Sequence, residues 1–290
     1  MPELPEVEVA ARNLRRWALG RKVRAVRADR GAARILRPAS ARGLTALAGG
    51  RLEEVRRRGK NLLLTLITPK GDPVGVWSHL GMTGKWLRRR ARAPVPRFAR
   101  LRVDLDDGTS LHYADLRLFG RFRVVPGARF ESLAEIAALG PDPLDDGIDV
   151  DRLHERLART RLPIKVAIMD QALLPGIGNI QASEGLFRAG IDPRRPARSL
   201  SRAELARVAR GLLDSIRFTL KTFRQSGADG ADADIDYVEE RKTPNPFLVY
   251  GREGERCPGY KTRKKGGSDS TIVRIVQAQR ATFFCPRCQR

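Results

Sequence analysis

The 290-residue chain has only 3 cysteines and 3 histidines, the residues that form disulfides and most often bind zinc. Aromatic residues make up 6%. A disulfide framework would usually use an even number of cysteines spread along the sequence. Here Cys257, Cys285 and Cys288 all lie near the C-terminus. This clustering indicates a metal site or the remnant of one rather than an extracellular disulfide scaffold.

Long hydrophobic runs are also lacking. No apolar run approaches the ~18 residues expected of a membrane-spanning helix. The N-terminus carries Glu3 and Glu6 instead of a basic cluster before an apolar stretch, so it does not resemble a signal peptide. We therefore expect a cytoplasmic protein without a membrane partner.

Acidic residues are scarce relative to basic ones, at 33 Asp+Glu against 56 Lys+Arg, which gives a formal net charge of +23. An arginine bias of the source proteome would give a basic surface, but the excess is far beyond what solubility needs. The charge favours a polyanionic partner, and nucleic acid is the commonest one. A membrane surface is disfavoured because the basic residues form no single amphipathic helix.

The first part of the chain is mostly of strand character after one leading helix. Residues 6–19 place apolar side chains on one helical face, and Gly20 suits the C-terminal cap. Apolar and polar residues alternate over 100–105, and a turn at 107–108 precedes a second alternating segment. Strands are also expected at 62–66, 74–77 and 121–125. We interpret this part as a two-sheet sandwich.

A Pro/Gly/Asp cluster at 139–147 marks the expected domain boundary, beyond which the pattern is helical. Helices are expected at 150–159, 163–171, 180–189 and 202–223, and a short basic β module is expected at the end. The sequence thus predicts an α+β protein with three parts. These are a β-sandwich domain with one leading helix (1–138), a helical domain (139–250) and a C-terminal β-hairpin (251–290).

The chain opens MPELPEVE, and removal of Met1 would expose the secondary amine of Pro2. An α-amino group has a pKa near ~8, so part of it is unprotonated at neutral pH and can attack an electrophilic sugar carbon. Glu3 and Glu6 are near enough in sequence to move protons. On spacing alone, an extended and solvated terminus would be the simpler interpretation.

The whole chain resembles the formamidopyrimidine-DNA glycosylase family. After MPELPEVE, matching motifs follow in order: RRGKNLLL at 57–64, HLGMTG at 79–84, DLRLFG at 115–120, LGPDPL at 139–144, GIGNIQASE at 176–184 and QRATFFCPRCQ at 279–289. Leu4 favours this branch over the related endonuclease VIII branch, which usually has Gly there. The resemblance identifies 176–184 as part of a helix–two-turn–helix element.

The resemblance also implies the roles of individual residues. Pro2 would be the nucleophile, Glu3 the acid/base that opens the sugar ring, Glu6 a supporting carboxyl and Lys60 a group that contacts the lesion or a flanking phosphate. Three residues would fill the void left by an extruded base, and three would contact DNA near the lesion. The void-filling residues are Met82, Arg117 and Phe119, and the other contacts are Lys165, Asn179 and Arg280.

The C-terminal module departs from the family, which ends in a zinc finger with two Cys-x₂-Cys pairs. Cys285 and Cys288 form one pair, but Cys257 is alone because Tyr260 has replaced its partner. Zinc could be held by the three thiolates with Asp269 or water as the fourth ligand. A zincless hairpin and a redox-active cysteine pair are the alternatives.

Two further departures bear on the substrate. Leu116 and Leu118 replace the usual Pro and second Arg beside Arg117, and residues 224–248 are acidic where the family's lesion loop commonly carries a GGTT-like run. The sequence predicts a monomeric bifunctional glycosylase and abasic-site lyase acting on oxidised purines in damaged duplex DNA. The alternatives are an endonuclease VIII-like preference for oxidised pyrimidines, a catalytically silent DNA-binding protein, and a basic RNA-binding or ribosome-associated protein.

Overall fold

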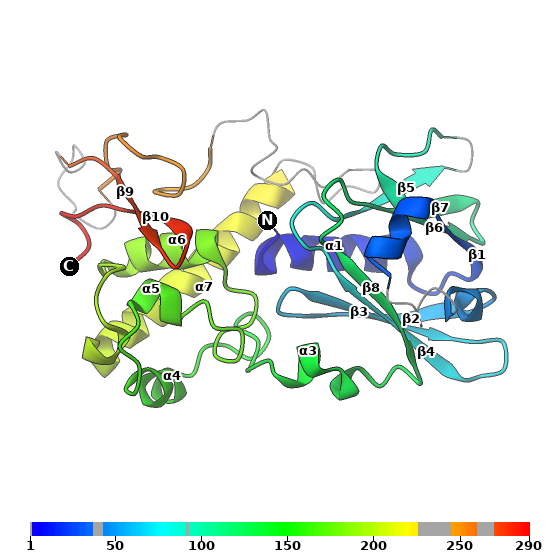
Figure 1. The fold of residues 1–290 in the computed structure, drawn as a ribbon, viewed down its shortest axis with the longest axis horizontal. Coiled ribbons are helices and arrows are strands. Elements are labelled where there is room, and N and C mark those ends of the chain that lie inside the picture. Colours follow the sequence, from blue (N-terminus) through cyan, green and yellow to red (C-terminus); the bar gives the residue numbers. More distant parts are fainter. Residues whose placement is uncertain (1, 37–42, 91–92, 226–244, 260–269) are drawn as a thin grey trace. The chain divides into compact units, whose positions relative to one another are not determined.

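A computed structural model describes residues 2–36, 43–90, 93–225, 245–259 and 270–290 of the chain. These residues form two compact units (Figure 1). The first runs up to Ala137 and includes residues 223–225, and the second runs from Ala138 to Thr222 and again from residue 245 onward. The predicted α+β class is confirmed. The three-domain division with boundaries at 138/139 and 250/251 stays a prediction.

The first unit is a sandwich of two antiparallel four-stranded sheets. One sheet has the order β1-β6-β7-β5 and the other β2-β3-β4-β8. The strands are β1 (Val23–Ala28), β2 (Arg51–Arg58), β3 (Asn61–Ile67), β4 (Pro73–His79), β5 (Lys85–Arg90), β6 (Ala99–Leu105), β7 (Thr109–Ala114) and β8 (Arg121–Pro126). Apolar side chains of both sheets meet in a shared core, where the rings of Trp86 and Phe122 are 6.3 Å apart.

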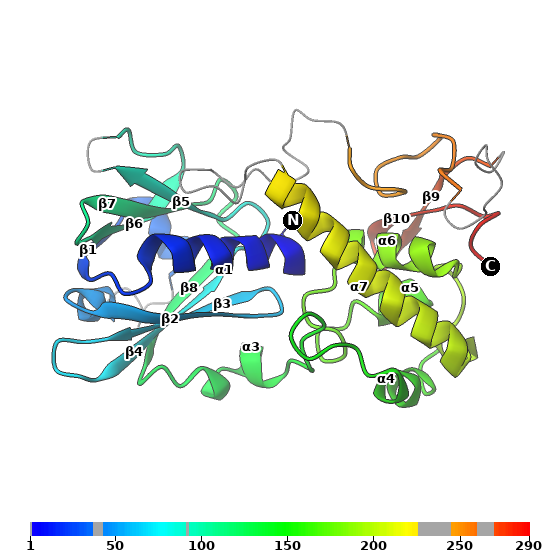
Figure 2. The ribbon, with the colours of Figure 1, turned by 180° about the vertical axis from the view of Figure 1, so that it is seen from behind.

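Helix α1 (Leu4–Ala18) lies between the two sheets and contacts β2, β3 and β5 (Figure 2). It begins earlier than the predicted residue 6, because Pro5 has no N–H to lose in the first turn and its fixed φ suits that position. Leu4, Leu14 and Trp17 are buried against the sheets. The packing of α1 therefore fixes the place of the residues that precede it.

Two chain segments, here called crossovers, pass from one sheet to the other and lie beside each other. The segment 80–84 joins β4 to β5, and the segment 115–120 joins β7 to β8. A Cβ at Gly81, whose φ is +62°, would lie 2.4 Å from the carbonyl carbon of Phe119. Only glycine at residue 81 allows this approach, so the two crossovers touch backbone to backbone.

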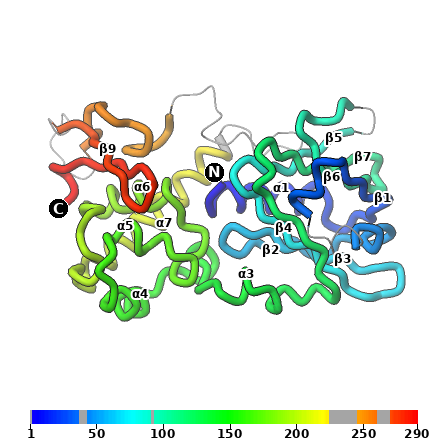
Figure 3. Tube along the Cα trace, in the orientation of Figure 1, coloured from blue at the N-terminus to red at the C-terminus, as the bar shows by residue number. Residues whose placement is uncertain are grey.

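The second unit is helical and ends in a hairpin. Its helices are α4 (Val150–Leu157), α5 (Ile164–Ala167), α6 (Asn179–Ala189) and α7 (Arg202–Gln225), and the hairpin consists of β9 (Val273–Gln277) and β10 (Arg280–Phe284). A further short helix, α3 (Ala134–Ala137), closes the first unit. The hairpin packs with β10 against α6, as the chain trace in Figure 3 also shows.

The predicted helix at 163–171 is wrong in its extent, because α5 ends at Ala167. Beyond it the chain turns tightly, and the amide of Gln171 holds the turn by donating to the carbonyls of Met169 and Ile177. Its side-chain oxygen accepts from the N–H of Gly176 at 2.9 Å. Among the described residues, no helix is long and apolar enough to cross a membrane.

Candidate active site and nucleic-acid interface

The three residues predicted for the reactive terminus lie together at the start of α1. Pro2 is buried, and Glu3 and Glu6 are 1% and 3% exposed. The backbone N–H of Glu3 donates to Glu6 Oε2 at 3.0 Å. Burial, and after it the charge of Glu3, raises the pKa of Glu6 to about 7. A carboxyl that titrates near neutrality therefore lies beside the chain terminus.

Lys60 lies in the two-residue turn that joins β2 to β3, next to Gly59, whose φ is +56°. An ion pair that the sequence analysis did not identify connects this turn to α1. The buried guanidinium of Arg57 donates to Glu8 Oε2 at 3.0 Å and to the carbonyl of Gly59 at 3.3 Å. Because Glu8 belongs to α1, the pair ties the Lys60 turn to the helix whose start holds Pro2.

His79 is a second residue that sequence reasoning missed, although it opens the HLGMTG motif. Burial, and after it the charges of Lys60 and Arg121, lowers the pKa of His79 to about 4. Its Nδ1 accepts a hydrogen bond from the N–H of Gly81 at 3.1 Å. The ring is therefore neutral at physiological pH and fixes the start of the crossover that carries Met82.

The predicted void-filling residues are on the two crossovers. Met82 is half-buried on the first, while Arg117 and Phe119 are exposed on the second, with Phe119 at 53%. The guanidinium of Arg117 lies 4.8 Å from the centre of the Phe119 ring. The adjoining Leu118 has a φ of +57°, which costs a side chain with a Cβ about 1 kcal/mol. The loop thus presents an apolar ring and a cation to solvent.

Three predicted DNA contacts of the second unit lie close together. Lys165 Nζ, fully buried on α5, donates to Asn179 Oδ1 at 2.5 Å. Asn179 is the first residue of α6, and its Nδ2 donates to the carbonyl of Ala281 at 2.9 Å. Arg280 adjoins Ala281 on β10 and is exposed. The start of α6 and the exposed Arg280 form an arrangement suited to an anion such as phosphate, whereas Lys165 is completely buried and bonds to Asn179.

Glu184 anchors the C-terminal end of the predicted lesion loop and the residues after it, and sequence reasoning did not identify it. It is fully buried on α6 and accepts hydrogen bonds from the N–H groups of Leu248, Val249 and Tyr250 at 2.8 to 3.0 Å. Burial raises the pKa of Glu184. Only its place in the GIGNIQASE motif could have singled it out.

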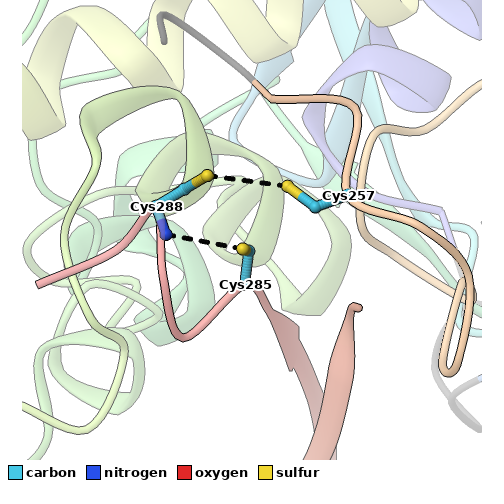
Figure 4. Close-up of side chains that lie close together, drawn as sticks. All are labelled: Cys257, Cys285 and Cys288. Atoms are coloured by element: carbon cyan, nitrogen blue, oxygen red, sulfur yellow. Dashed lines mark hydrogen bonds between the residues drawn. The ribbon is translucent and has the colours of Figure 1, made fainter. Parts of the chain in front are cut away.

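The three cysteines converge at the base of the hairpin, where their sulfur atoms all lie within 4.8 Å of one another. Cys257 Sγ and Cys288 Sγ are 3.6 Å apart, and the Cys288 N–H donates to Cys285 Sγ at 3.4 Å (Figure 4). Burial acts to raise the pKa of Cys285, but hydrogen bonds from Cys288, Ser270 and Cys257 outweigh it and lower the pKa to about 7. The three thiols could hold a zinc ion.

Some predictions fall outside the described residues. Two residues of the predicted metal site are outside the described ranges: Tyr260, in the place of the fourth cysteine, and Asp269, the candidate oxygen ligand. So is most of the lesion loop, residues 226–244. In the first unit, Glu3 and Glu6 bond to each other at the start of α1, and the crossover of Met82 contacts the crossover of Arg117 and Phe119. In the second unit, Lys165 and Asn179 bond to each other, and Asn179 bonds to the hairpin that carries Arg280.

Family models match three segments that make up most of the chain. The model described as the formamidopyrimidine-DNA glycosylase N-terminal domain matches residues 1–122, and the H2TH domain of the same glycosylase matches residues 139–228. A third model, described as the zinc finger found in FPG and IleRS, matches residues 270–290. These matches cover the sandwich, the helical unit and the hairpin.

Curated relatives align over their full lengths. A formamidopyrimidine-DNA glycosylase from Rhodospirillum centenum is 37% identical over 301 residues, and one from Stutzerimonas stutzeri is 38% identical over 301 residues, each with 100% of both chains covered. Among solved structures, Lactococcus lactis Fpg in complex with DNA containing an abasic site superposes with a TM-score of 0.82 at 28% identity, covering 99% of each chain. Fpg from Thermus thermophilus gives 0.74 at 34% identity, covering 99% of this chain and 98% of that one.

Proposed function

Because the chain belongs to the formamidopyrimidine-DNA glycosylase family, we propose that it removes oxidised purines from duplex DNA in base excision repair and then nicks the strand. Its substrates would be 8-oxoguanine and formamidopyrimidines, and it would act on the nucleoid in the cytoplasm. The observation that carries the proposal is the grouping of Pro2, Glu3 and Glu6 at one helix start. This grouping supplies an amine and two carboxyl groups at one place.

Removal of Met1 makes Pro2 a secondary amine that attacks C1′ of the damaged nucleotide. A nitrogen–carbon bond forms as the glycosidic bond breaks, and the base leaves with the bonding electrons and a proton. Glu3 then delivers a proton to the ring oxygen, the C1′–O4′ bond opens, and the nitrogen lone pair completes an iminium. Glu6, with its pKa near 7, holds a proton for part of the time beside this step.

The iminium acidifies the C2′ proton, so its removal expels the 3′ phosphate by β-elimination. A second elimination expels the 5′ phosphate, and water hydrolyses the iminium to release the sugar fragment and restore the amine. Lys60, at the β2–β3 turn, would neutralise a flanking phosphate. No organic cofactor enters this sequence, because the chain's own amine carries the covalent intermediate.

Base excision requires the damaged nucleotide outside the helix, and the void it leaves costs a few kcal/mol unless filled. Phe119 supplies an exposed ring that can enter a base stack, and Arg117 supplies donors for the orphaned partner base. Met82 lies on the neighbouring crossover and can fill an irregular gap. Asn179 and Arg280 would hold the phosphates of the damaged strand, and the buried Lys165 would position Asn179 through its hydrogen bond.

Zinc has a structural role in this proposal. Cys257, Cys285 and Cys288 would hold it, and the closeness of their sulfur atoms fits three thiolate ligands. When bound, the ion stabilises the base of the hairpin and supplies no step of the reaction. The hairpin would then present Arg280 to the DNA backbone.

Borohydride trapping tests the proposal directly, because the reagent reduces an iminium to a stable covalent adduct. We expect the wild-type protein to give an adduct with an 8-oxoguanine duplex, and Glu3→Gln to give little or none. Mass spectrometry of the adduct should place the DNA on Pro2, with Met1 absent. An adduct on another residue would contradict the mechanism.

A panel of duplexes tests the substrate class with the same protein. We expect excision of 8-oxoguanine and formamidopyrimidines to exceed excision of thymine glycol. The opposite order would assign the chain an oxidised-pyrimidine preference. Duplex binding without trapping on any lesion would mark the chain as a silent DNA-binding protein.

A further inference from the structure

We propose that Asp115, acting with Thr83, is a positioning group that holds the two void-filling crossovers in one fixed arrangement. The inference rests on the proposed function, since it concerns residues that would enter the DNA. Asp115 opens the 115–120 crossover, and Thr83 lies on the 80–84 crossover directly after Met82. The resemblance assigned neither residue a role.

The carboxylate of Asp115 is completely buried and bonds to both crossovers. Its Oδ1 accepts a hydrogen bond from the Thr83 hydroxyl at 2.5 Å. Its Oδ2 accepts one from the backbone N–H of Gly120 at 2.8 Å, at the far end of its own crossover. One carboxylate therefore joins the first crossover to both ends of the second.

The backbone of Arg117 is held at the same point. Its N–H lies 3.1 Å from Thr83 Oγ1 and 3.2 Å from Asp115 Oδ1, so it is shared between them. The Thr83 hydroxyl thus donates to Asp115 and accepts from Arg117 at once. Loss of this hydroxyl removes a direct connection between the residue after Met82 and the backbone of the expected wedge.

The packing around Asp115 leaves little room for another arrangement. A Cβ at Gly84 or Gly120 would lie 2.2 Å or 1.8 Å from the Tyr113 hydroxyl oxygen, so both crossovers close against this ring. The Tyr113 hydroxyl donates to the carbonyl of His79 at 3.3 Å. Tyr113 thus limits the backbone positions of both crossovers, while the side chains of Arg117 and Phe119 remain exposed.

This combination is what a wedge requires. A side chain that enters a base stack must hold its position against the stack, and a fixed backbone lowers the conformational entropy lost on insertion. Displacement by about 1 Å at a remote support can reduce a rate by about 100-fold. Asp115 and Thr83 should therefore affect the reaction through the positions of Met82, Arg117 and Phe119.

The test separates base excision from the chemistry at the sugar. An abasic site in single-stranded DNA has no partner base and no damaged base to extrude, so its cleavage does not need a wedge. We expect Thr83→Val and Asp115→Asn to reduce single-turnover excision of 8-oxoguanine from a duplex by about 10- to 100-fold. Cleavage of a single-stranded abasic oligonucleotide should stay within about twofold of wild type.

Two further variants are the controls. Thr83→Ser keeps the hydroxyl and should retain most duplex excision. Thr109→Val removes a hydroxyl that donates to Asp107 Oδ1 at 2.7 Å in the β6–β7 turn, a bond of the same kind away from the crossovers. It should leave both reactions near wild type, which separates positioning from a general loss of a threonine–aspartate bond.

A fluorescent base gives a readout of wedge insertion itself. With 2-aminopurine opposite the lesion, the wild-type protein should raise the fluorescence on binding as the base unstacks, and Thr83→Val should reduce that rise. Equal losses in the duplex and single-stranded reactions, or no loss in either, would overturn the inference. If wild type cleaves neither substrate, the proposed function fails instead.

Discussion

At the scale of single residues, burial changes the chemistry of the N-terminal carboxyl groups. Glu6 is 3% exposed and accepts the N–H of Glu3, and its pKa is raised from an ordinary 4.5 to about 7 by burial and then by the charge of Glu3. A raised carboxyl pKa means that the folded state binds this proton more tightly than the unfolded state. Ionisation of Glu6 therefore opposes folding.

This gives a prediction for stability against pH. Below about pH 4.5 the carboxyl is protonated in both states and contributes no difference, whereas above about pH 7 it is ionised in both and the folded state is penalised. Glu6→Gln cannot ionise, so its free energy of unfolding should rise relative to wild type between these limits, by up to about 3 kcal/mol. Denaturant unfolding at about pH 4.5, 6 and 8 measures the difference.

Parallel stability curves for Glu6→Gln and wild type would show that Glu6 titrates at an ordinary pKa. Glu155→Gln is the matched control, since Glu155 lies exposed on α4. Its curve should stay close to that of wild type at every pH.

Residues in short sequence motifs were predictable, and residues defined by distant contacts were not. MPELPEVE indicated Pro2, Glu3 and Glu6 through its resemblance to the family, because the whole motif is one short segment of the chain. Nothing local distinguishes Thr83 from other threonines, because its partner Asp115 is in a different crossover. Lys165 was named from a motif, but its complete burial depends on packing that one sequence segment does not encode.

At the scale of elements, the β2–β3 hairpin and α1 are joined by the pair Arg57–Glu8. The Arg57 side chain is 1% exposed and that of Glu8 10%, so both charges are stabilised mainly by protein groups and not by water. Glu8 has a second partner in Arg12, whose Nε lies 2.8 Å from Glu8 Oε1. Glu8 would therefore keep a charged partner if Arg57 were replaced.

We predict that Glu8→Gln destabilises the protein more than Arg57→Met does. The first substitution leaves a buried guanidinium without its carboxylate, at a cost of about 3–5 kcal/mol. The second leaves Glu8 still paired with Arg12, and it should cost less. Chemical denaturation of both variants and of the Glu8→Gln/Arg57→Met double variant measures this, and the double variant should recover part of the loss. Equal costs would mean that Arg12 does not compensate.

The residue pattern of each strand explains whether the sequence predicted it. β6 alternates apolar and polar residues and was found within one residue of its start, and β3, β4 and β8 were found from their apolar runs. β2 and β5, RLEEVRRR and KWLRRR, were missed because arginines and glutamates occupy their outer positions. Their few buried side chains, such as Leu52 and Trp86, suffice because neighbouring strands supply the rest of the core.

At the scale of the whole molecule, charge is the dominant property. The net charge of +23 is what remains after every acidic group is counted. Some arginines are nevertheless paired with a nearby carboxylate. Arg202, for example, donates to both carboxylate oxygens of Asp151, at 2.5 and 2.8 Å. The excess of cations that remains would be neutralised by DNA phosphates, with release of counterions.

The last prediction distinguishes a phosphate contact from general attraction. The logarithm of the association constant should fall linearly with the logarithm of salt concentration, with a slope of about −0.9 for each phosphate neutralised. If exposed Arg280 contacts a phosphate, Arg280→Ala should weaken binding and reduce the magnitude of that slope by about 1. Arg202→Ala should change the slope less, because Asp151 already neutralises that guanidinium. Fluorescence anisotropy of an abasic-analogue duplex over a salt series measures both slopes. Equal slopes for wild type and Arg280→Ala would remove Arg280 from the DNA interface while leaving the N-terminal chemistry untouched.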